Sequence, residues 1–329
     1  MDKPFLSYDQ QIQLLQKRGL IIKNQDFAHH ALSTLSYYDL INRYKVYFMN
    51  PDDTFIDGIS IEYLYNFYLF DKEVQAFIMK YSVLIESIFK TRFSYVLAKH
   101  YGVQVKDYLN KYHYKSSPKG SYSFITIESK ILKWLSSKNV KNPTKHYKEN
   151  HDHIPPWILF KNITLGNTIN LYDLLKDTPK YELADSILSN SSFGYDAKFN
   201  FILHAMNTVR RFRNAAAHNL NFTGLRIPRK YTPSPSIMYS LLGTPLLEKR
   251  NKKITSVDKE SLLGLYSAML SMIIFLDSSY LKSVFIEDFL LILDKENIRK
   301  EMYAKYAAIT NMPLTINQRF TEFYRQLKP

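Results

Sequence analysis

The sequence predicts an all-α protein, and two observations support that prediction. Only 9 Gly and 13 Pro interrupt its 329 residues, whereas a β-sandwich needs turn residues at short, regular intervals. Apolar residues also recur at intervals of three and four over long stretches, which is the period of an amphipathic helix. Because 46% of the residues are apolar, a chain of this length can bury a large core. We therefore expect a helical bundle, either as one compact unit or as two closely packed domains.

The first 55 residues are expected to form short helices. One spans residues 10–16 and a second spans residues 26–35, and an aromatic helix and turn follow over residues 36–44. The run Pro51-Asp52-Asp53 ends this part of the chain, because such residues favour turns over helices.

A long helix should begin near Asp57 or Ser60 and end at Gly102, because glycine often follows the end of a helix. Arg92 lies on the apolar stripe of this helix and is expected to pair with a carboxylate, since an unpaired charge is costly on a buried face. The stripe itself consists of Val74, Ile78, Tyr81, Ile85, Ile88 and Val96.

The second half of the chain predicts further helices at residues 157–175 with a pause at Gly166, 181–188, 196–217, 258–276, 284–293 and 298 to the C-terminus. Residues 219–235 read as a basic loop. The predicted organisation is therefore N-terminal short helices over residues 1–55 and a helical core over residues 56–329. That core carries a Lys-rich insertion at about 106–150 and the C-terminal helices.

The net charge of +14, from 44 Lys and Arg against 30 acids, favours a polyanionic partner, either nucleic acid or an anionic membrane. The most apolar run, residues 262–276, is too short for a membrane span and contains Ser267 and Ser271, so we expect it to be a buried core helix. The N-terminus lacks the apolar core of a signal peptide. With no cysteine, disulfides and thiolate metal sites are excluded, and a cytoplasmic location without membrane contact is expected.

The segment 106–149 is the strongest candidate for an RNA contact surface. It contains ten lysines against three acids, so it supplies seven of the fourteen excess positive charges. Tyrosines and other aromatic residues alternate with the lysines, and aromatic rings can stack on unpaired bases while lysines neutralise phosphates. A solvated surface with tyrosines packed beneath it is an equally open interpretation. The residues predicted to contact RNA are Lys111, Lys115, Lys119, Lys138, Lys141, Lys145, Arg210, Arg211, Arg226, Arg229 and Lys230.

The run from Arg210 to Asn219, Arg-Arg-Phe-Arg-Asn-Ala-Ala-Ala-His-Asn, could carry chemistry. At about 100° per residue, the apolar residues upstream of it predict that Arg213 and Ala217 lie on the inward face, with Asn214 and His218 on its flank. These apolar residues are Phe199, Ile202, Leu203, Met206 and Val209. Two interpretations remain open, because an inward arginine must be paired or face a wet cleft.

In the first interpretation, Arg213 grips a phosphate and His218, whose imidazole titrates near neutral pH, moves a proton. In the second, Arg213 is a core residue bonded to a carboxylate such as Glu86. The spacing alone does not decide between them. His29-His30 and His151-x-His153 are read as surface histidines, and we expect no metal and no cofactor.

The chain resembles the abortive-infection (Abi) family of the AbiD/AbiF type through four blocks in the same order. The first is the tyrosine-rich run Tyr37-Tyr38-Asp39-Leu40-Ile41-Asn42-Arg43-Tyr44. The second comprises Leu69-Phe70-Asp71-Lys72-Glu73, Ile85-Glu86 and Tyr101-Gly102. The third comprises Pro156-Trp157, Leu165-Gly166 and Leu171-Tyr172, and the fourth is Arg213-Asn214-Ala215-Ala216-Ala217-His218. The chain departs from the family pattern at Lys161-Asn162, where an acidic residue is expected.

This resemblance implies a HEPN-like helical bundle, the fold of many metal-independent endoribonucleases. It implies that Arg213, Asn214 and His218 form a catalytic centre on RNA, and that two copies of the site face one another, as in a homodimer. In that case His218 acts as general acid or base, Arg213 neutralises charge on the phosphate and Asn214 orients it.

Two rival functions remain. In one, the chain holds a structured non-coding RNA in a ribonucleoprotein without cutting it. In the other, it is a toxin controlled by a partner.

Overall fold

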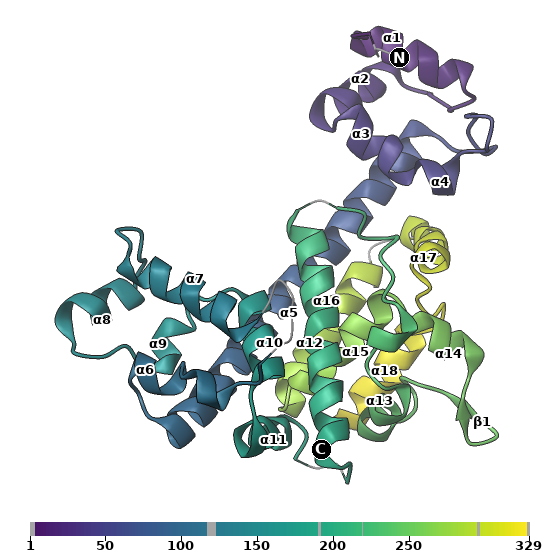
Figure 1. The fold of residues 1–329 in the computed structure, drawn as a ribbon. Helices are drawn as coiled ribbons and strands as arrows, with labels where there is room; N and C mark the ends of the chain where they lie inside the picture. Colours follow the sequence, from purple (N-terminus) through teal and green to yellow (C-terminus); the bar gives the residue numbers. More distant parts are fainter. Residues whose placement is uncertain (1–3, 117–122, 190–191, 219, 295–296, 328–329) are drawn as a thin grey trace.

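The prediction of an all-α fold is confirmed. The computed structural model describes residues 4–116, 123–189, 192–218, 220–294 and 297–327, and nearly all of its regular structure is helical (Figure 1). Within these ranges the strands are limited to β1 (Lys249–Arg250) and β2 (Lys253–Ile254), which pair antiparallel. Their turn passes through Asn251 and Lys252, both with left-handed φ.

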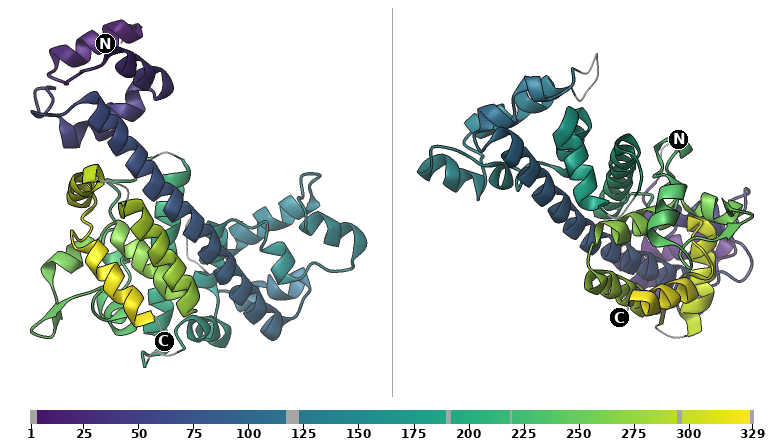
Figure 2. Two further views of the ribbon diagram at one scale, coloured as in Figure 1. Left: turned by 180° about the vertical axis from the view of Figure 1, so that it is seen from behind. Right: turned by 90° about the horizontal axis from the view of Figure 1, so that it is seen from below.

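Helix α5 (Ile61–Tyr101) is the long central helix, and other elements pack along its whole length (Figures 1 and 2). Its ends follow the sequence signals, because the Ser60 side chain accepts from the backbone N–H of Tyr63 and Gly102 stops the helix at φ 85°. The predicted stripe is buried, apart from Ile88, which is partly buried.

The N-terminal helices gather at the first half of α5 (Figure 1). Tyr44 and Phe48 pack against Phe67 of α5, with ring centroids 5.1 and 5.0 Å from its centroid. The boundary at residue 55 stays a prediction. The elements are α1 (Tyr8–Lys17), α2 (Gln25–Thr34), α3 (Tyr37–Leu40), the 3-10 helix η1 (Asn42–Tyr44) and α4 (Lys45–Phe48).

A buried carboxylate joins these helices to the rest of the protein. Asp71 of α5 accepts hydrogen bonds from the hydroxyls of Tyr44 (2.8 Å) and Tyr306 (3.0 Å) and from the Gln75 amide (2.7 Å). Tyr44 belongs to the N-terminal helices and Tyr306 to α17 (Asn297–Thr310). Three segments that are distant in sequence therefore meet at one side chain.

The Lys-rich segment extends sideways from the second half of α5 (Figure 2). Asn162, which stands where the family pattern has an acidic residue, donates to the Thr144 hydroxyl (2.9 Å) and to the Lys141 carbonyl (3.3 Å). Asn162 therefore attaches the Lys-rich segment to the loop that follows α9 (Pro156–Leu159). The other elements here are α6 (Val105–Tyr108), the 3-10 helix η2 (Lys111–His113), α7 (Phe124–Ser136) and α8 (Thr144–Asn150).

The remaining helices build the core around α5. Helix α12 (Tyr195–Ala217) packs against α5 and α15 (Leu265–Phe275), and every residue of α15 is buried, as predicted for this run. None of the helices in the described ranges is long and apolar enough to span a bilayer. The other elements are α10 (Leu165–Leu174), α11 (Asp177–Ile187), the 3-10 helix η3 (Arg229–Tyr231), α13 (Pro235–Leu242), α14 (Ser256–Ser261), α16 (Ser279–Asp294) and α18 (Ile316–Leu327).

Arg92 has the carboxylate partner that its position on the apolar stripe predicts. It forms an ion pair with Asp277 and donates to the Ser186 carbonyl at 2.7 Å. Arg92 is therefore a structural residue that ties α5 to the ends of α11 and α15.

The prediction of one helix over residues 258–276 is wrong, because the chain breaks between α14 and α15. Gly264 lies at the break, where a Cβ atom would stand 2.7 Å from the backbone carbonyl oxygen of Thr310 at the end of α17. The sequence alone does not reveal this approach, since Thr310 is far away along the chain.

Gly264→Ala is therefore expected to destabilise the protein by about 1–3 kcal/mol, because backbone must move to admit the methyl group. Urea denaturation measures this change. Gly166→Ala is the matched control, since its Cβ would meet only the Arg210 side chain at an ordinary 3.5 Å. Equal stability of Gly264→Ala and the wild type would contradict the close approach.

Candidate functional site at the end of α12

Arg213 and Asn214 lie near the end of α12, and His218 directly follows its last residue, Ala217. The helix begins after Gly194 and ends at His218, whose backbone N–H donates to the Asn214 carbonyl at 3.0 Å. Buried residues along the helix, including Ile202, Ala205 and Val209, anchor it in the core. The site thus sits at the tip of a fixed helix.

The predicted face of this helix is partly wrong. Ala217 is exposed and Arg213 is half-buried, while Phe212 and Ala215 are buried instead. The reason is a contact with the following loop, because the Phe212 ring packs edge-on against Phe222 at 5.7 Å. After Val209, the next buried residue on the inward face is therefore Phe212, three positions on, and not Arg213, four positions on.

Arg213 has no acidic partner among the described residues. Its Nη1 donates to the Asn214 side-chain oxygen at 3.1 Å, and its Nε is buried with no hydrogen-bond partner in the described part of the chain. Glu86, the carboxylate of the rival interpretation, forms an ion pair with Lys90 at 2.6 Å. The charge of Arg213 is therefore available to an anionic ligand.

His218 is exposed, but it does not lie beside Arg213 on the helix surface. At 100° per residue, five residues separate the two directions by about 140°, whereas Arg211 and His218 point within about 20° of each other. Asn214 lies between Arg213 and His218 around the helix, about 40° from His218. A single chain therefore presents the imidazole and the Arg213 guanidinium on different sides of the tip.

The tyrosine-rich block reaches this tip. Arg43, with a side chain only 5% exposed, donates to the carbonyl of Leu220 at 3.2 Å and pairs with Asp39 at 2.6 Å. It thus holds the loop that follows His218. The sequence predicts no role for Arg43, although the residue belongs to the tyrosine-rich block.

A small cavity of about 170 Å³ lies along α12 beside Arg211. His204 and Thr208 of α12 line it with Arg211, and the residues are spaced as neighbours on one helix face. Ile227 and Tyr231 of the following loop close it. His204 and Thr208 cannot be identified as cavity residues from the sequence, because the cavity exists only where this loop folds back over the helix.

The cavity presents groups that suit a phosphate oxygen. His204 Nδ1 lies 3.2 Å from the Thr232 carbonyl and donates to it, so Nε2 can donate to a phosphate oxygen when the ring is protonated. The Thr208 hydroxyl is buried and has no hydrogen-bond partner among the described residues. Arg211 adds a guanidinium, whose fork binds phosphate well.

The other predicted arginines are largely engaged within the protein. Arg226 donates to the carbonyls of Thr223 (3.1 Å) and Ile309 (2.5 Å), and Arg229 pairs with Glu260. Arg210 is half-buried and donates to the Asn207 side chain at 3.1 Å, and its Nε, like that of Arg213, is buried without a hydrogen-bond partner in the described part of the chain. Burial lowers the pKa of Arg210, and the neighbouring Arg211 charge adds to that shift.

The predicted lysines are more accessible. Lys138 and Lys145 border a hollow of about 370 Å³ together with Lys148, which was not predicted by name. Lys230 is exposed beside the Tyr231 ring, at 4.8 Å. Lys119 lies outside the described residues. The remaining predicted lysines, which are exposed as well, are Lys111, Lys115 and Lys141.

Comparison with known proteins supports the resemblance drawn from the sequence. A family model described as Abi-like protein matches residues 30–222, which is more than half of the chain. This span runs from α2 to the loop after α12, so it includes both Asp71 and the His218 tip. Neither the curated proteins nor the solved structures gave a match.

Proposed function

Because the chain belongs to the Abi-like protein family, a family of abortive infection and phage defence, we propose that it acts in this defence by cutting RNA without a metal. One observation carries the proposal. An exposed imidazole and an arginine without an acidic partner among the described residues lie at the end of a helix whose other face is anchored in the core. The HEPN-like character of the bundle is part of the proposal.

The chemistry follows from the two side chains. His218 takes the proton of the ribose 2′-OH, the 2′-oxygen attacks phosphorus, and the bond to the 5′-oxygen breaks. The protonated His218 then gives its proton to the leaving 5′-oxygen, so the products are a 2′,3′-cyclic phosphate and a 5′-hydroxyl and the imidazole returns to its starting state. Arg213 stabilises the charge on the phosphate oxygens, and Asn214 holds the guanidinium in place.

The angle of about 140° between the directions of Arg213 and His218 supports a site that two subunits complete. In a homodimer with the α12 tips facing one another, Arg213 of one copy can meet His218 of the other. The same geometry also favours the rival function, in which a single chain binds a structured RNA and does not cut it. In both hypotheses, cleavage and binding alone, RNA lies at this end of α12. A toxin that is controlled by a protein partner is compatible with each of them.

The experiment that tests the proposal is incubation of the purified full chain with labelled single-stranded RNA in EDTA. Appearance of cyclic-phosphate ends supports cleavage. Intact RNA that copurifies with the protein and is never cut supports the ribonucleoprotein instead. Absence of both binding and cleavage would reject RNA as the partner.

The cavity beside Arg211 is proposed to seat one phosphate of the bound strand. Arg211→Ala is therefore expected to weaken RNA binding and to reduce the slope of log affinity against log salt by about 0.7, the value for one phosphate on a single strand. Titrations at several salt concentrations, followed by fluorescence anisotropy, measure the slope.

Arg325→Ala is the matched control for this measurement. Arg325 is an exposed helical arginine on α18, so its removal lowers the net charge equally. An equal slope in Arg211→Ala and Arg325→Ala would exclude the cavity from the RNA path.

A further inference from the structure

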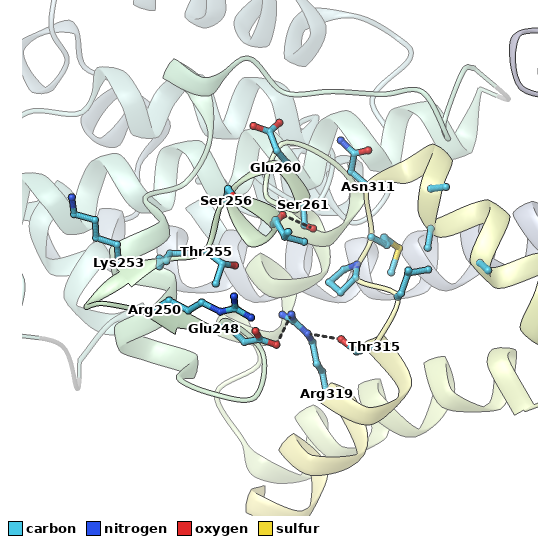
Figure 3. A pocket seen from close by; sticks show the side chains of 18 residues that line it. Glu248, Arg250, Lys253, Thr255, Ser256, Glu260, Ser261, Asn311, Thr315 and Arg319 are labelled. Atoms are coloured by element: carbon cyan, nitrogen blue, oxygen red, sulfur yellow. Dashed lines mark hydrogen bonds and ion pairs between the residues drawn. The ribbon is translucent and has the colours of Figure 1, made fainter.

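The most spacious cavity described lies in the C-terminal part of the chain, outside the residues that match the family. It has a volume of about 1070 Å³ and runs between the β1–β2 hairpin with α14 on one side and α17 with the start of α18 on the other (Figure 3). We call it the C-terminal groove. Nothing in the proposed RNA chemistry uses it.

The walls of the C-terminal groove are mainly apolar. Ala304, Ala307 and Ala308 share one face of α17, because they are three and four residues apart. Small residues let another helix approach closely. Val257 and Leu314, which also line the groove, are 65% and 69% exposed, although large aliphatic side chains are usually buried. The groove thus presents an uncovered apolar surface.

The acidic side chains of the groove are already neutralised. Arg319 pairs with Glu248 (3.0 Å) and with buried Asp258 (2.9 Å), as Figure 3 shows in part. Glu260 pairs with Arg229. Each of these carboxylates is therefore paired with an arginine, although Glu248 and Asp258 share Arg319.

Two cations of the hairpin, in contrast, have no acidic partner within the described ranges. Arg250 and Lys253 line the groove and are exposed, and neither forms an ion pair with any residue in the described ranges. Lys252 at the hairpin turn is exposed as well. The rim at this end of the groove is thus positively charged above an apolar floor.

We propose that the C-terminal groove binds a helical segment of a partner protein that combines aliphatic with acidic side chains. Aliphatic residues at intervals of three and four fit against the α17 alanines, Val257 and Leu314, which is the helix-in-groove mode of recognition. Carboxylates on the same segment face Arg250 and Lys253, so charge complementarity selects the partner. No aromatic side chain is among the described residues lining the groove, so it lacks the stacking surface that single-stranded RNA requires.

One wall of the C-terminal groove, helix α17, also supports the loop that follows His218. Helix α17 forms one wall, and the carbonyl of its Ile309 accepts the 2.5 Å hydrogen bond from Arg226 in that loop. A bound partner would therefore rest on the helix that supports the α12 tip. The binding proposal does not rest on RNA cleavage, and it is tested without it.

The experiment uses the full chain and two fluorescein-labelled helical peptides. Both carry leucine at intervals of three and four, and one has glutamate where the other has lysine. The acidic peptide is expected to bind roughly tenfold more tightly than the basic one. In the double variant Arg250→Glu/Lys253→Glu this preference should reverse. Anisotropy titrations measure both affinities.

Lys145→Glu/Lys148→Glu is the matched control, because it reverses two exposed charges on α8 instead. It should leave the preference for the acidic peptide unchanged. Ala308→Glu, at an exposed position on the apolar wall, should weaken binding of the acidic peptide without loss of the fold, as judged by thermal melting.

Three results would overturn the proposal. One is equal binding of the two peptides. Another is a single-stranded oligouridine that competes with the acidic peptide and loses its own binding in Arg250→Glu/Lys253→Glu, which would make the groove an RNA surface. The third is a homodimer that this double variant dissociates in sedimentation, which would make the occupant a second copy of this chain.

Discussion

Replacement of His218 by alanine is expected to abolish RNA cleavage while RNA binding persists. General acid and base catalysis contributes about 10²–10⁴-fold to such reactions, and alanine offers no group that can carry the proton. The fold should survive, because the His218 side chain is exposed at the end of α12. Cleavage in EDTA, scored by cyclic-phosphate ends, and binding by anisotropy measure the two effects separately.

His30→Ala is the control for this experiment, since His30 is an exposed helical histidine on α2 that the proposed chemistry does not use. It should cleave as the wild type does. Cleavage at the wild-type rate by His218→Ala would show that the catalytic centre lies elsewhere. Equal binding without any cleavage in both the wild type and His218→Ala would favour the ribonucleoprotein.

Mixing two inactive variants tests whether subunits share the site. If Arg213 and His218 of one centre come from different subunits, a dimer of one Arg213→Ala and one His218→Ala chain contains one intact centre. Partial activity should then return on mixing. If both residues act within one chain, the mixture stays inactive.

The parts of the fold that the sequence predicts well have local signals. The bounds of α5 and α12 come within a few residues of expectation, because Ser60, Gly102 and evenly spaced apolar residues act within their own helices. Arg92 could be assigned a carboxylate partner, since burial of a lone charge is costly wherever the helix packs. Which carboxylate it meets, Asp277, depended on the tertiary fold.

The features that escape prediction are contacts between distant segments. The helix break at Gly264 depends on the close approach of the Thr310 carbonyl. The burial of Phe212 on α12 depends on its contact with Phe222 in the following loop. The cavity beside Arg211 needs the loop that carries Tyr231. For the same reason the residues of the α12 tip could be named from the sequence, but the burial of Phe212 and Ala215 and the exposure of Ala217 could not be predicted.

Asp71→Ala is expected to produce the largest loss of stability. Tyr44 and Tyr306 are fully buried, and both would lose the acceptor of their hydroxyl groups. A buried hydroxyl without a partner costs about 1–3 kcal/mol, so the two together should lower the free energy of unfolding by about 3 kcal/mol or more. Urea denaturation followed by circular dichroism measures this loss.

Asp196→Ala is the matched control. Asp196 also accepts a hydrogen bond from a tyrosine hydroxyl, that of Tyr181 at 2.9 Å, but it is exposed. Water can replace its bond, so the cost should stay below about 1 kcal/mol. Similar losses in Asp71→Ala and Asp196→Ala would mean that the buried network adds no stability of its own.

Asp71→Asn separates the charge of the carboxylate from its hydrogen bonds. Burial raises the pKa of Asp71 above its ordinary value of 3.8, so the folded protein holds this proton more tightly than the unfolded chain does. The contribution of Asp71 to the free energy of unfolding is therefore largest below that ordinary value, and it falls as pH rises towards the raised pKa. Asparagine does not titrate, so wild-type stability measured relative to Asp71→Asn should decline with rising pH over this window.

A difference that stays constant, or that grows with pH, would contradict the raised pKa of Asp71. The test also bears on the α12 tip, because Tyr44 sits next to Arg43, which holds the Leu220 carbonyl. If Asp71 fixes the N-terminal helices in place, Asp71→Ala should weaken the hydrogen bond between Arg43 and the Leu220 carbonyl in the loop after His218. Asp71→Asn, which can still hydrogen-bond both tyrosines, should preserve it.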